Sequence, residues 1–286
     1  MRKVSVLGAA LWFCVSFGAA SADAHLTVRI FASDAVAQPI RQIGYLFERA
    51  HPNVKLDYEF AASGVFVGAI RQGVPPDIFI SSSNKEMNRL ISLSFINFPQ
   101  TIAYDYFAAA TRCTNPVNSP GSVRITESNL VREIGSPNVK LVVASPTLSP
   151  AGRHTFRMLG RMGADGAGSF AGIMSHTTEV IGPDRVLAKV MSGKADLGIV
   201  YASQIVAVKR MGECLNAIPI AKRYNRKVEL SVAPLKTSQF HFVGRTRRRI
   251  DAEYARFLLS ERAQRIFKDW GLVPVKNERT FFSRLF

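Results

Sequence analysis

The chain has 286 residues, of which 47% are hydrophobic and 20% charged, a composition typical of a soluble protein with one large or two medium domains. It contains no short-period repeat and no low-complexity linker, which excludes repeat architectures. The formal net charge of +16 is uneven, because residues 222–286 hold 16 Lys and Arg against 6 Asp and Glu. Such a field favours anionic partners, but it does not choose among a small anion, nucleic acid and an acidic membrane surface.

The first residues have the pattern of a secretory signal peptide. Arg2 and Lys3 precede an apolar run from Val4 to Ala20, and the small residues of AASADA follow. The run is shorter than the roughly 20 residues of a membrane-spanning helix, and Ser and Gly interrupt it. We therefore expect residues 1–24 to be removed and the mature protein to be exported to the periplasm.

Removal of the signal peptide leaves two cysteines, Cys113 and Cys214. Two thiols in an oxidising compartment are a natural pair, and we expect a disulfide between them. Two buried free thiols are the alternative reading.

Strand and helix signals alternate along the chain. Alternating apolar residues predict strands over 26–31 and 54–60, and an apolar stripe from Val36 to Ala50 predicts a helix between them. The same alternation continues with strands over 78–81, 141–144 and 197–201, helices from about 151 and over 183–192, and a strand from 228. Repeated strand–helix–strand units imply an α/β fold with mostly parallel sheets flanked by helices.

A loop rich in Gly, Pro, Ser and Asn, residues 111–129, interrupts this order early in a second lobe. We expect residues 25–104 and 222–286 to form the first lobe and residues 105–221 the second. Two crossings of the chain then join the lobes, and the cleft between them is the expected ligand site.

Four small-residue turns lie where a strand is predicted to end and a helix to begin: ASDA (32–35), AASG (61–64), SPAG (149–152) and IGPD (181–184). Helix N-termini present unpaired N–H groups and the positive end of the helix dipole, so they bind anions without a charged side chain. Ordinary helix capping explains any one of these turns equally well. Four turns facing one cleft indicate an anion site.

Four longer stretches resemble, in order and spacing, the periplasmic molybdate-binding proteins of ABC uptake systems: FAASGVFVGAIRQGVPPDIFISSSNKEMNRL, VVASPTLSPAGRHTFRMLGRMG, VMSGKADLGIVYAS and FLLSERAQRIFKDWGLVPV. The most specific parts are GxPxDxFIS, PAG and LGIVY. The resemblance covers nearly the whole mature chain and implies a two-lobed periplasmic binding protein of the type II fold.

The resemblance also implies ligand-binding residues. Ser63 falls on the position that donates both a hydroxyl and an N–H to the oxyanion. Ala151 falls on a backbone N–H donor, and Tyr201 on a hydroxyl donor. The first turn departs from the pattern, because Ala35 stands where the family has a serine, although Ser33 lies two residues earlier. Asp34 between them would repel an anion unless it points away or pairs with a basic residue.

The fourth donor position falls on Pro183, which has no N–H. Gly182 or Asp184 could replace it after a small shift in register. Arg153 and His154 follow the PAG turn, and they either add positive charge to the cleft or face solvent as part of a first helical turn.

The resemblance implies a receptor that captures a tetrahedral oxyanion, molybdate or tungstate in type, and delivers it to an inner-membrane ABC permease. We expect a monomer with no cofactor, no metal site and no bound nucleic acid. The sequence has none of the hydrolase, metalloprotease, Walker or dinucleotide-binding motifs, and its five histidines lack metal-ligand spacing, so we do not expect an enzyme. Two alternatives stay open: the same scaffold binds another anion, or its basic C-terminal surface binds a polyanion.

Overall fold

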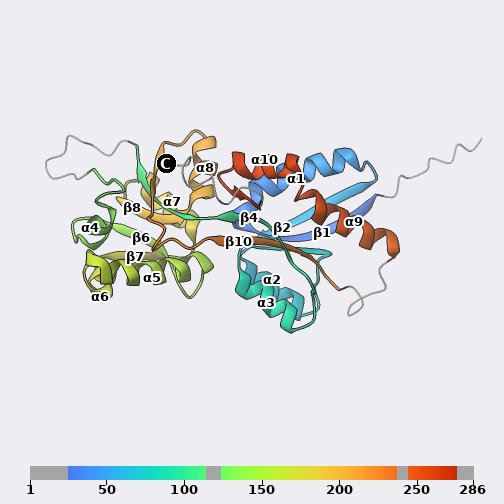
Figure 1. Ribbon diagram of the computed structural model, residues 1–286, viewed down its shortest axis with the longest axis horizontal. Coiled ribbons are helices and arrows are strands. Elements are labelled where there is room, and N and C mark those ends of the chain that lie inside the picture. The colour runs from blue at the N-terminus through green and yellow to red at the C-terminus, as the bar shows by residue number, and fades with distance from the viewer. Residues whose placement is uncertain (1–24, 114–123, 237–243, 276–286) are drawn as a thin grey trace, which may run out of the picture.

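The structure is a computed structural model that describes residues 25–113, 124–236 and 244–275, so the predicted signal peptide lies outside the described residues. The described chain forms two lobes side by side, each a sheet flanked by helices (Figure 1).

The first lobe contains a six-stranded sheet in the order β11-β4-β10-β3-β1-β2. Its strands are β1 (Leu26–Ser33), β2 (Val54–Ala61), β3 (Ile78–Ser81), β4 (Gln100–Asp105), β10 (Val228–Pro234) and β11 (Val273–Pro274). Its helices are η1 (Asp34–Val36), α1 (Ala37–Ala50), α2 (Ser63–Arg71), α3 (Asn84–Ser92), α9 (Arg245–Phe257) and α10 (Glu261–Asp269).

Alternate residues of β1 serve two cores, one on each face of this sheet. Ile30 packs in the core formed with α1, α9 and α10, whereas Phe31 packs in the core formed with α2 and α3. Both side chains are almost fully buried. This burial on both faces explains why the strand reads as nearly continuous apolar sequence after Arg29.

The second lobe contains a five-stranded sheet in the order β7-β6-β8-β5-β9. Its strands are β5 (Phe107–Arg112), β6 (Leu141–Ala144), β7 (Thr177–Val180), β8 (Leu197–Tyr201) and β9 (Leu215–Pro219). Its helices are α4 (Leu130–Gly135), α5 (Pro150–Met162), η2 (Gly163–Ala167), α6 (Phe170–Ser175), α7 (Pro183–Met191) and α8 (Ala202–Arg210).

The prediction of a two-lobed α/β protein is confirmed, but the expectation of mostly parallel sheets is wrong. In the first sheet only the pairs of β1 with β2 and β3 are parallel, and in the second only the pairs of β6 with β7 and β8. The strands that carry the chain between the lobes, β4, β5, β9 and β10, all pair antiparallel. Along the described chain, no helix lies between β4 and β5 or between β9 and β10, so the βα alternation did not predict the direction of these strands.

Two crossings join the lobes, one from β4 to β5 and one from β9 to β10 (Figure 1). Asn225, on the second crossing, is bonded to both backbone polar groups of Phe107 on the first. Phe107 N–H donates to Asn225 Oδ1 at 3.0 Å, and Asn225 Nδ2 donates to the Phe107 carbonyl at 2.7 Å. The crossings are therefore fixed side by side. The residue boundaries of the two lobes given above stay a prediction.

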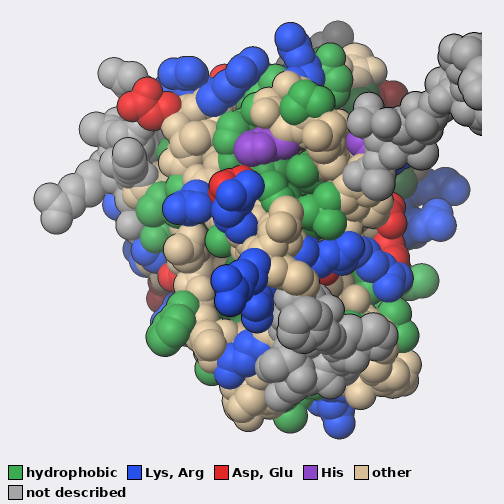
Figure 2. Space-filling model, turned by 90° about the vertical axis from the view of Figure 1, so that its right-hand side faces the viewer, with side chains coloured by type: hydrophobic (Ala, Val, Ile, Leu, Met, Phe, Trp, Pro, Cys, Tyr) green, Lys and Arg blue, Asp and Glu red, His purple; other side chains and the backbone are tan. Residues whose placement is uncertain are grey.

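Basic side chains on the outer end of the first lobe form several separate groups among apolar and neutral surface (Figure 2). Part of the RTRRR run is structural, because Arg247 Nη1 donates to both carboxylate oxygens of Asp77 at 3.0 Å. Asp77 also accepts the N–H of Arg29 at 2.8 Å. The Asp77 carboxylate thus links α9 to β1.

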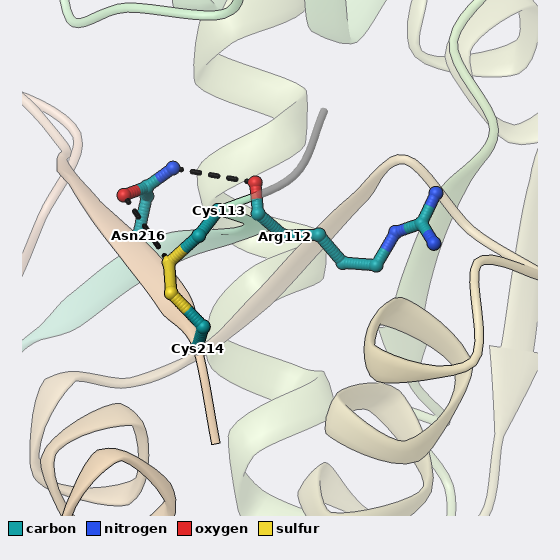
Figure 3. Close-up of a disulfide and its surroundings, with 4 residues drawn as sticks. All are labelled: Arg112, Cys113, Cys214 and Asn216. Atoms are coloured by element: carbon teal, nitrogen blue, oxygen red, sulfur yellow. Dashed lines mark hydrogen bonds between the residues drawn. A yellow bond between two sulfur atoms is a disulfide. The ribbon is translucent and has the colours of Figure 1, made fainter. Parts of the chain in front are cut away.

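Cys113 and Cys214 form a disulfide, with their Cα atoms 5.4 Å apart (Figure 3). It links the end of β5 to the residue before β9. The Cys113 N–H donates to the Cys214 carbonyl at 3.3 Å, and Asn216 Nδ2 donates to the Arg112 carbonyl at 3.3 Å. The bond closes a loop of 101 residues that includes most of the second lobe.

Candidate functional site

Three buried serines from the first lobe meet at one edge of its sheet. Ser33 ends β1, Ser63 begins α2 after β2, and Ser82 follows β3. The Ser33 and Ser82 hydroxyl oxygens lie 2.8 Å apart, and the Ser82 N–H donates to Ser63 Oγ at 3.4 Å. Strands β2, β1 and β3 are parallel neighbours, so their carboxyl ends share this edge, the usual place for a ligand in an α/β sheet. Because Ser63 Oγ accepts from Ser82, its own proton is available to a ligand.

In the ASDA turn, the Asp34 side chain takes up a backbone donor of the same turn. The Ala35 N–H donates to Asp34 Oδ1 at 2.8 Å, so the backbone donor expected there already has an anionic acceptor. Asp34 is accessible to solvent, but the surrounding protein partly desolvates its carboxylate and raises its pKa. The Asp184 carboxylate adds to this rise, while the Ala35 N–H opposes it.

A second carboxylate lies beside the AASG turn. An ideal Cβ on Gly64 would be 3.9 Å from both Cδ and Oε1 of Glu86, so this carboxylate approaches the first turn of α2. Glu86 Oε1 also lies 3.8 Å from Arg153 Nη2, in the first turn of α5 on the other lobe. The Glu86 side chain is 8% exposed and that of Arg153 is 29% exposed. This contact is an ion pair across the cleft.

The PAG turn of the second lobe begins α5. Ala151 is 2% exposed and is the second residue of the helix, where a backbone N–H has no acceptor within the helix. Gly152 lies so close to the loop after β6 that a Cβ would be 2.3 Å from the Ser145 carbonyl oxygen. Glycine is therefore required for this packing, which brings the start of α5 against the end of β6.

The fourth turn, at the start of α7, has lost one donor. Pro183 is the first helical residue and Gly182 is the N-cap. The N–H groups of Arg185 and Val186 both donate to the Gly182 carbonyl, at 3.1 and 3.2 Å. Of the two residues expected to replace the missing donor, Gly182 precedes the helix and Asp184 has the first backbone N–H within it. Its carboxylate interacts electrostatically with Asp34 across the cleft.

Tyr201 ends β8 with a hydroxyl that has no hydrogen-bond partner within the described residues, although the side chain is only 3% exposed. Burial raises its pKa, as do the carboxylates of Asp105 and Asp34, while Arg153 lowers it. The hydroxyl is thus a neutral donor, placed among charged groups of both lobes. An unpartnered buried hydroxyl is costly, which makes it a strong candidate ligand contact.

A cavity of about 450 Å³ opens between the lobes beside the first turn. It is lined by Asp34 and Ala35 of the first lobe, by Asp184 of the second, and by the apolar side chains of Trp270 and Met211, among others. Ser63, Ala151 and Tyr201 do not line it. The structure therefore joins Ser33 to Ser63 through Ser82, and places Ala35 in the lining of this cavity.

Sequence reasoning missed Ser82 and Glu86 as residues of this site. The run SSSNKE contains a helix-capping pattern, and the Glu86 N–H does donate to Ser83 Oγ at 3.4 Å. That pattern explains the residues locally and conceals their position beside the cleft. Within the described parts of the chain, no three His, Cys, Asp or Glu side chains gather in a metal-binding arrangement.

Comparison with known families identifies the chain at the level of its family. The sequence pattern of the family described as "Bacterial extracellular solute-binding protein" matches residues 28–273. The chain belongs to this family. Its members are receptors for solutes, which fits a site placed between two lobes.

Individual members of the solute-binding family are similar over most of the chain. The molybdate-binding protein ModA of Escherichia coli strain K12 is 26% identical over 267 residues, covering 92% of this chain and 95% of the relative. The molybdate-binding protein ModA of Mycobacterium tuberculosis strain H37Rv is 25% identical over 217 residues, 74% of this chain and 76% of the relative.

Solved structures of solute-binding proteins share the fold. The substrate-binding domain of a molybdenum ABC transporter from Clostridium difficile superposes with a TM-score of 0.66 at 21% identity, covering 87% of this chain and 99% of that one. The sulfate-binding protein SubI of Mycobacterium tuberculosis superposes with a TM-score of 0.69 at 17% identity, covering 91% of this chain and 90% of that one. At these identities the likeness establishes the fold alone.

Proposed function

We propose that this solute-binding protein captures a tetrahedral oxyanion of the molybdate or tungstate type between its lobes and delivers it to an ABC importer. The observation that carries the proposal is the buried Tyr201 hydroxyl, which has no hydrogen-bond partner within the described residues and is therefore available to donate to a ligand. The molybdate-binding relatives support the choice of anion.

The other donors come from both lobes. Ser63 offers a hydroxyl proton from the first lobe, and Ala151 offers an N–H at the start of α5. Each hydrogen bond to an anion contributes about 1.5 to 3 kcal/mol, so a few such donors offset the dehydration of a compact oxyanion. Binding of one ligand by both lobes couples capture to closure of the lobes. The closed conformation is the one that a permease would recognise.

Export to the periplasm and docking on an inner-membrane permease belong to the same proposal. The signal peptide pattern of residues 1–24 and the extracellular character of the family support export. Within the described residues, no helix has the length and apolarity needed to cross a membrane. We propose that the mature protein acts as a monomer.

Asp34 and Glu86 favour a second candidate ligand. A carboxylate beside the anion accepts a hydrogen bond from a protonated oxyanion such as hydrogen phosphate, but repels one that has no proton. The second candidate function is therefore capture of a hydrogen-bearing oxyanion on the same scaffold. It uses the same donors and differs in the anion alone.

Isothermal titration of the mature protein with molybdate, tungstate, sulfate and phosphate tests both candidates. Tight binding of molybdate and tungstate with weak binding of phosphate supports the first. The reverse order supports the second. Absence of heat and of a thermal shift with all four anions rejects an oxyanion receptor.

A further inference from the structure

A second pocket, lined by basic residues, lies between α5 and the second crossing. Its volume is about 360 Å³, and its lining includes His154, Arg157, Arg161 and Arg226 with the rings of Phe107 and Tyr224. We propose that this pocket binds a multiply charged phosphate-type anion, independently of any ligand held between the lobes. The inference does not depend on the proposed function.

Helical spacing places the basic residues together. His154, Arg157 and Arg161 are three, four and seven residues apart on α5, so they share one face of the helix. The second crossing runs past this face and adds Arg226 and the buried Tyr224. The pocket thus gathers three guanidinium groups from two separate segments.

These charges are not compensated by ion pairs. Within the described residues, no carboxylate lies within ion-pair distance of Arg157, Arg161 or Arg226, and no acidic residue lines the pocket. Asp165, on the turn after α5, is engaged elsewhere, accepting from the Tyr224 hydroxyl at 2.8 Å and lying 3.7 Å from Arg223 Nε. An anion in the pocket would remove the repulsion among the three guanidinium groups.

Arg161 indicates where such an anion would bind. Its Nη2 donates to the Tyr224 carbonyl, which fixes the guanidinium against the crossing. Its Nε is buried and has no acceptor within the described residues. A buried N–H of a charged group rarely lacks a partner, and guanidinium forks match the oxygens of a phosphate group.

The aromatic ring of Phe107 lines this pocket and contacts a residue predicted to bind the ligand in the cleft. Its centroid lies 4.7 Å from that of Tyr201 and 6.0 Å from that of His154. Burial lowers the pKa of His154, and so do Arg157, Arg153, Arg226 and Arg161. An anion among these arginines would raise this pKa, so His154 is a built-in reporter of occupancy.

Titration calorimetry with inorganic pyrophosphate at low salt tests the inference. We expect the mature wild-type protein to bind pyrophosphate, and the double variant Arg157→Gln/Arg226→Gln to bind it at least tenfold more weakly. The matched control Arg262→Gln/Arg265→Gln removes the same charge from exposed positions of α10 and should change the affinity less than twofold. Equal weakening in both variants, or no binding to wild type, overturns the proposal.

Proton NMR of the histidine rings gives a second readout. Saturating pyrophosphate should raise the pKa of His154 and leave the ring resonances of His176 in place, with His154→Gln used to assign the His154 resonance. Ser63→Ala should not alter pyrophosphate binding. If molybdate fails to bind while pyrophosphate raises the His154 pKa, the proposed function fails and this inference stands. If molybdate displaces pyrophosphate completely and His154 does not respond, pyrophosphate occupies the cleft and the inference is wrong.

Discussion

Arg153 Nη2 lies 3.8 Å from Glu86 Oε1, and the two side chains belong to different lobes. The same Glu86 carboxylate approaches the first turn of α2 beside Ser63. A protein carboxylate therefore stands near a position that the resemblance assigns to a ligand oxyanion, with a cation of the opposite lobe as its counter-ion. Ligand binding must then compete with this ion pair.

Glu86→Gln tests the competition directly. The substitution keeps the shape of the side chain, removes the negative charge beside α2 and releases Arg153 toward the ligand. We expect molybdate to bind several-fold more tightly, measured by isothermal titration. The control is Glu253→Gln, which removes the same charge from a half-buried carboxylate that pairs with the exposed Arg249 on α9. A weaker affinity in Glu86→Gln would mean that the ion pair serves closure rather than opposing the ligand.

Tyr201→Phe separates binding from stability. Because the Tyr201 hydroxyl is buried without a partner, its removal leaves no protein group unsatisfied. The ligand-free variant should have a thermal midpoint equal to or above that of wild type. Its affinity for the oxyanion should fall about tenfold or more, the effect of one lost hydrogen bond to an anion of about 1.5 kcal/mol. A large loss of stability with unchanged affinity would assign the hydroxyl a structural role.

Ser63→Ala removes the hydroxyl that has a proton to donate. The expected loss of affinity is again about tenfold. The Ser82 N–H also loses its acceptor, so a modest loss of stability accompanies the change. Ser92→Ala, at the exposed end of α3, is the matched control. Equal affinities in the two variants would place the ligand away from the AASG turn.

Asp34→Asn should change the proton linkage of binding. Desolvation raises the pKa of Asp34, and a bound anion would raise it further, so wild-type binding should take up protons and weaken as the pH rises through this pKa. The number of protons taken up on binding is measured by calorimetric titration in buffers of different ionisation enthalpy. The titrations are done at about pH 5, just above the ordinary range of carboxylate pKa values. In Asp34→Asn the uptake should shrink and the affinity should increase. Identical uptake in both proteins would show that Asp34 does not face the ligand.

Loss of the disulfide should affect the second lobe far more than the site. Closure of a 101-residue loop restricts the unfolded chain, for which the chain-entropy estimate is about 4 to 5 kcal/mol. Cys113→Ser/Cys214→Ser should therefore lower the thermal midpoint by roughly 10 °C. The oxyanion affinity should stay within about twofold of wild type, since β5 carries the bond at the end opposite to the crossing. An unchanged midpoint would contradict this estimate.

Much of the fold follows from the sequence because the apolar patterns are strong. The stripe from Val36 to Ala50 becomes η1 and α1, and the strands predicted at 78–81, 141–144 and 197–201 lie at those residues. The antiparallel strands β4, β5 and β9 did not stand out. β4 passes into β5 without a helix, and β9 passes into β10 in the same way, so the direction of these strands is set by the two crossings rather than by local pattern.

The candidate site was harder to predict, because its decisive features are long-range contacts. The Asp34 carboxylate was recognised as a difficulty, but its bond to the Ala35 N–H depends on the fold of the turn. Glu86 lies 67 residues before Arg153 in sequence, and its local pattern indicates a helix cap. The role of Asp77 is likewise visible only in the fold, where its carboxylate contacts Arg29 and Arg247, far from it in sequence.

Anomalous X-ray diffraction at the molybdenum edge, from crystals of the mature protein with molybdate, tests the central claim most directly. The account predicts one strong peak between the lobes, with oxyanion oxygens within hydrogen-bond distance of Ser63 Oγ, the Ala151 N–H and the Tyr201 hydroxyl. A peak confined to another surface, or no peak at a molybdate concentration that saturates a control binding protein, would contradict it.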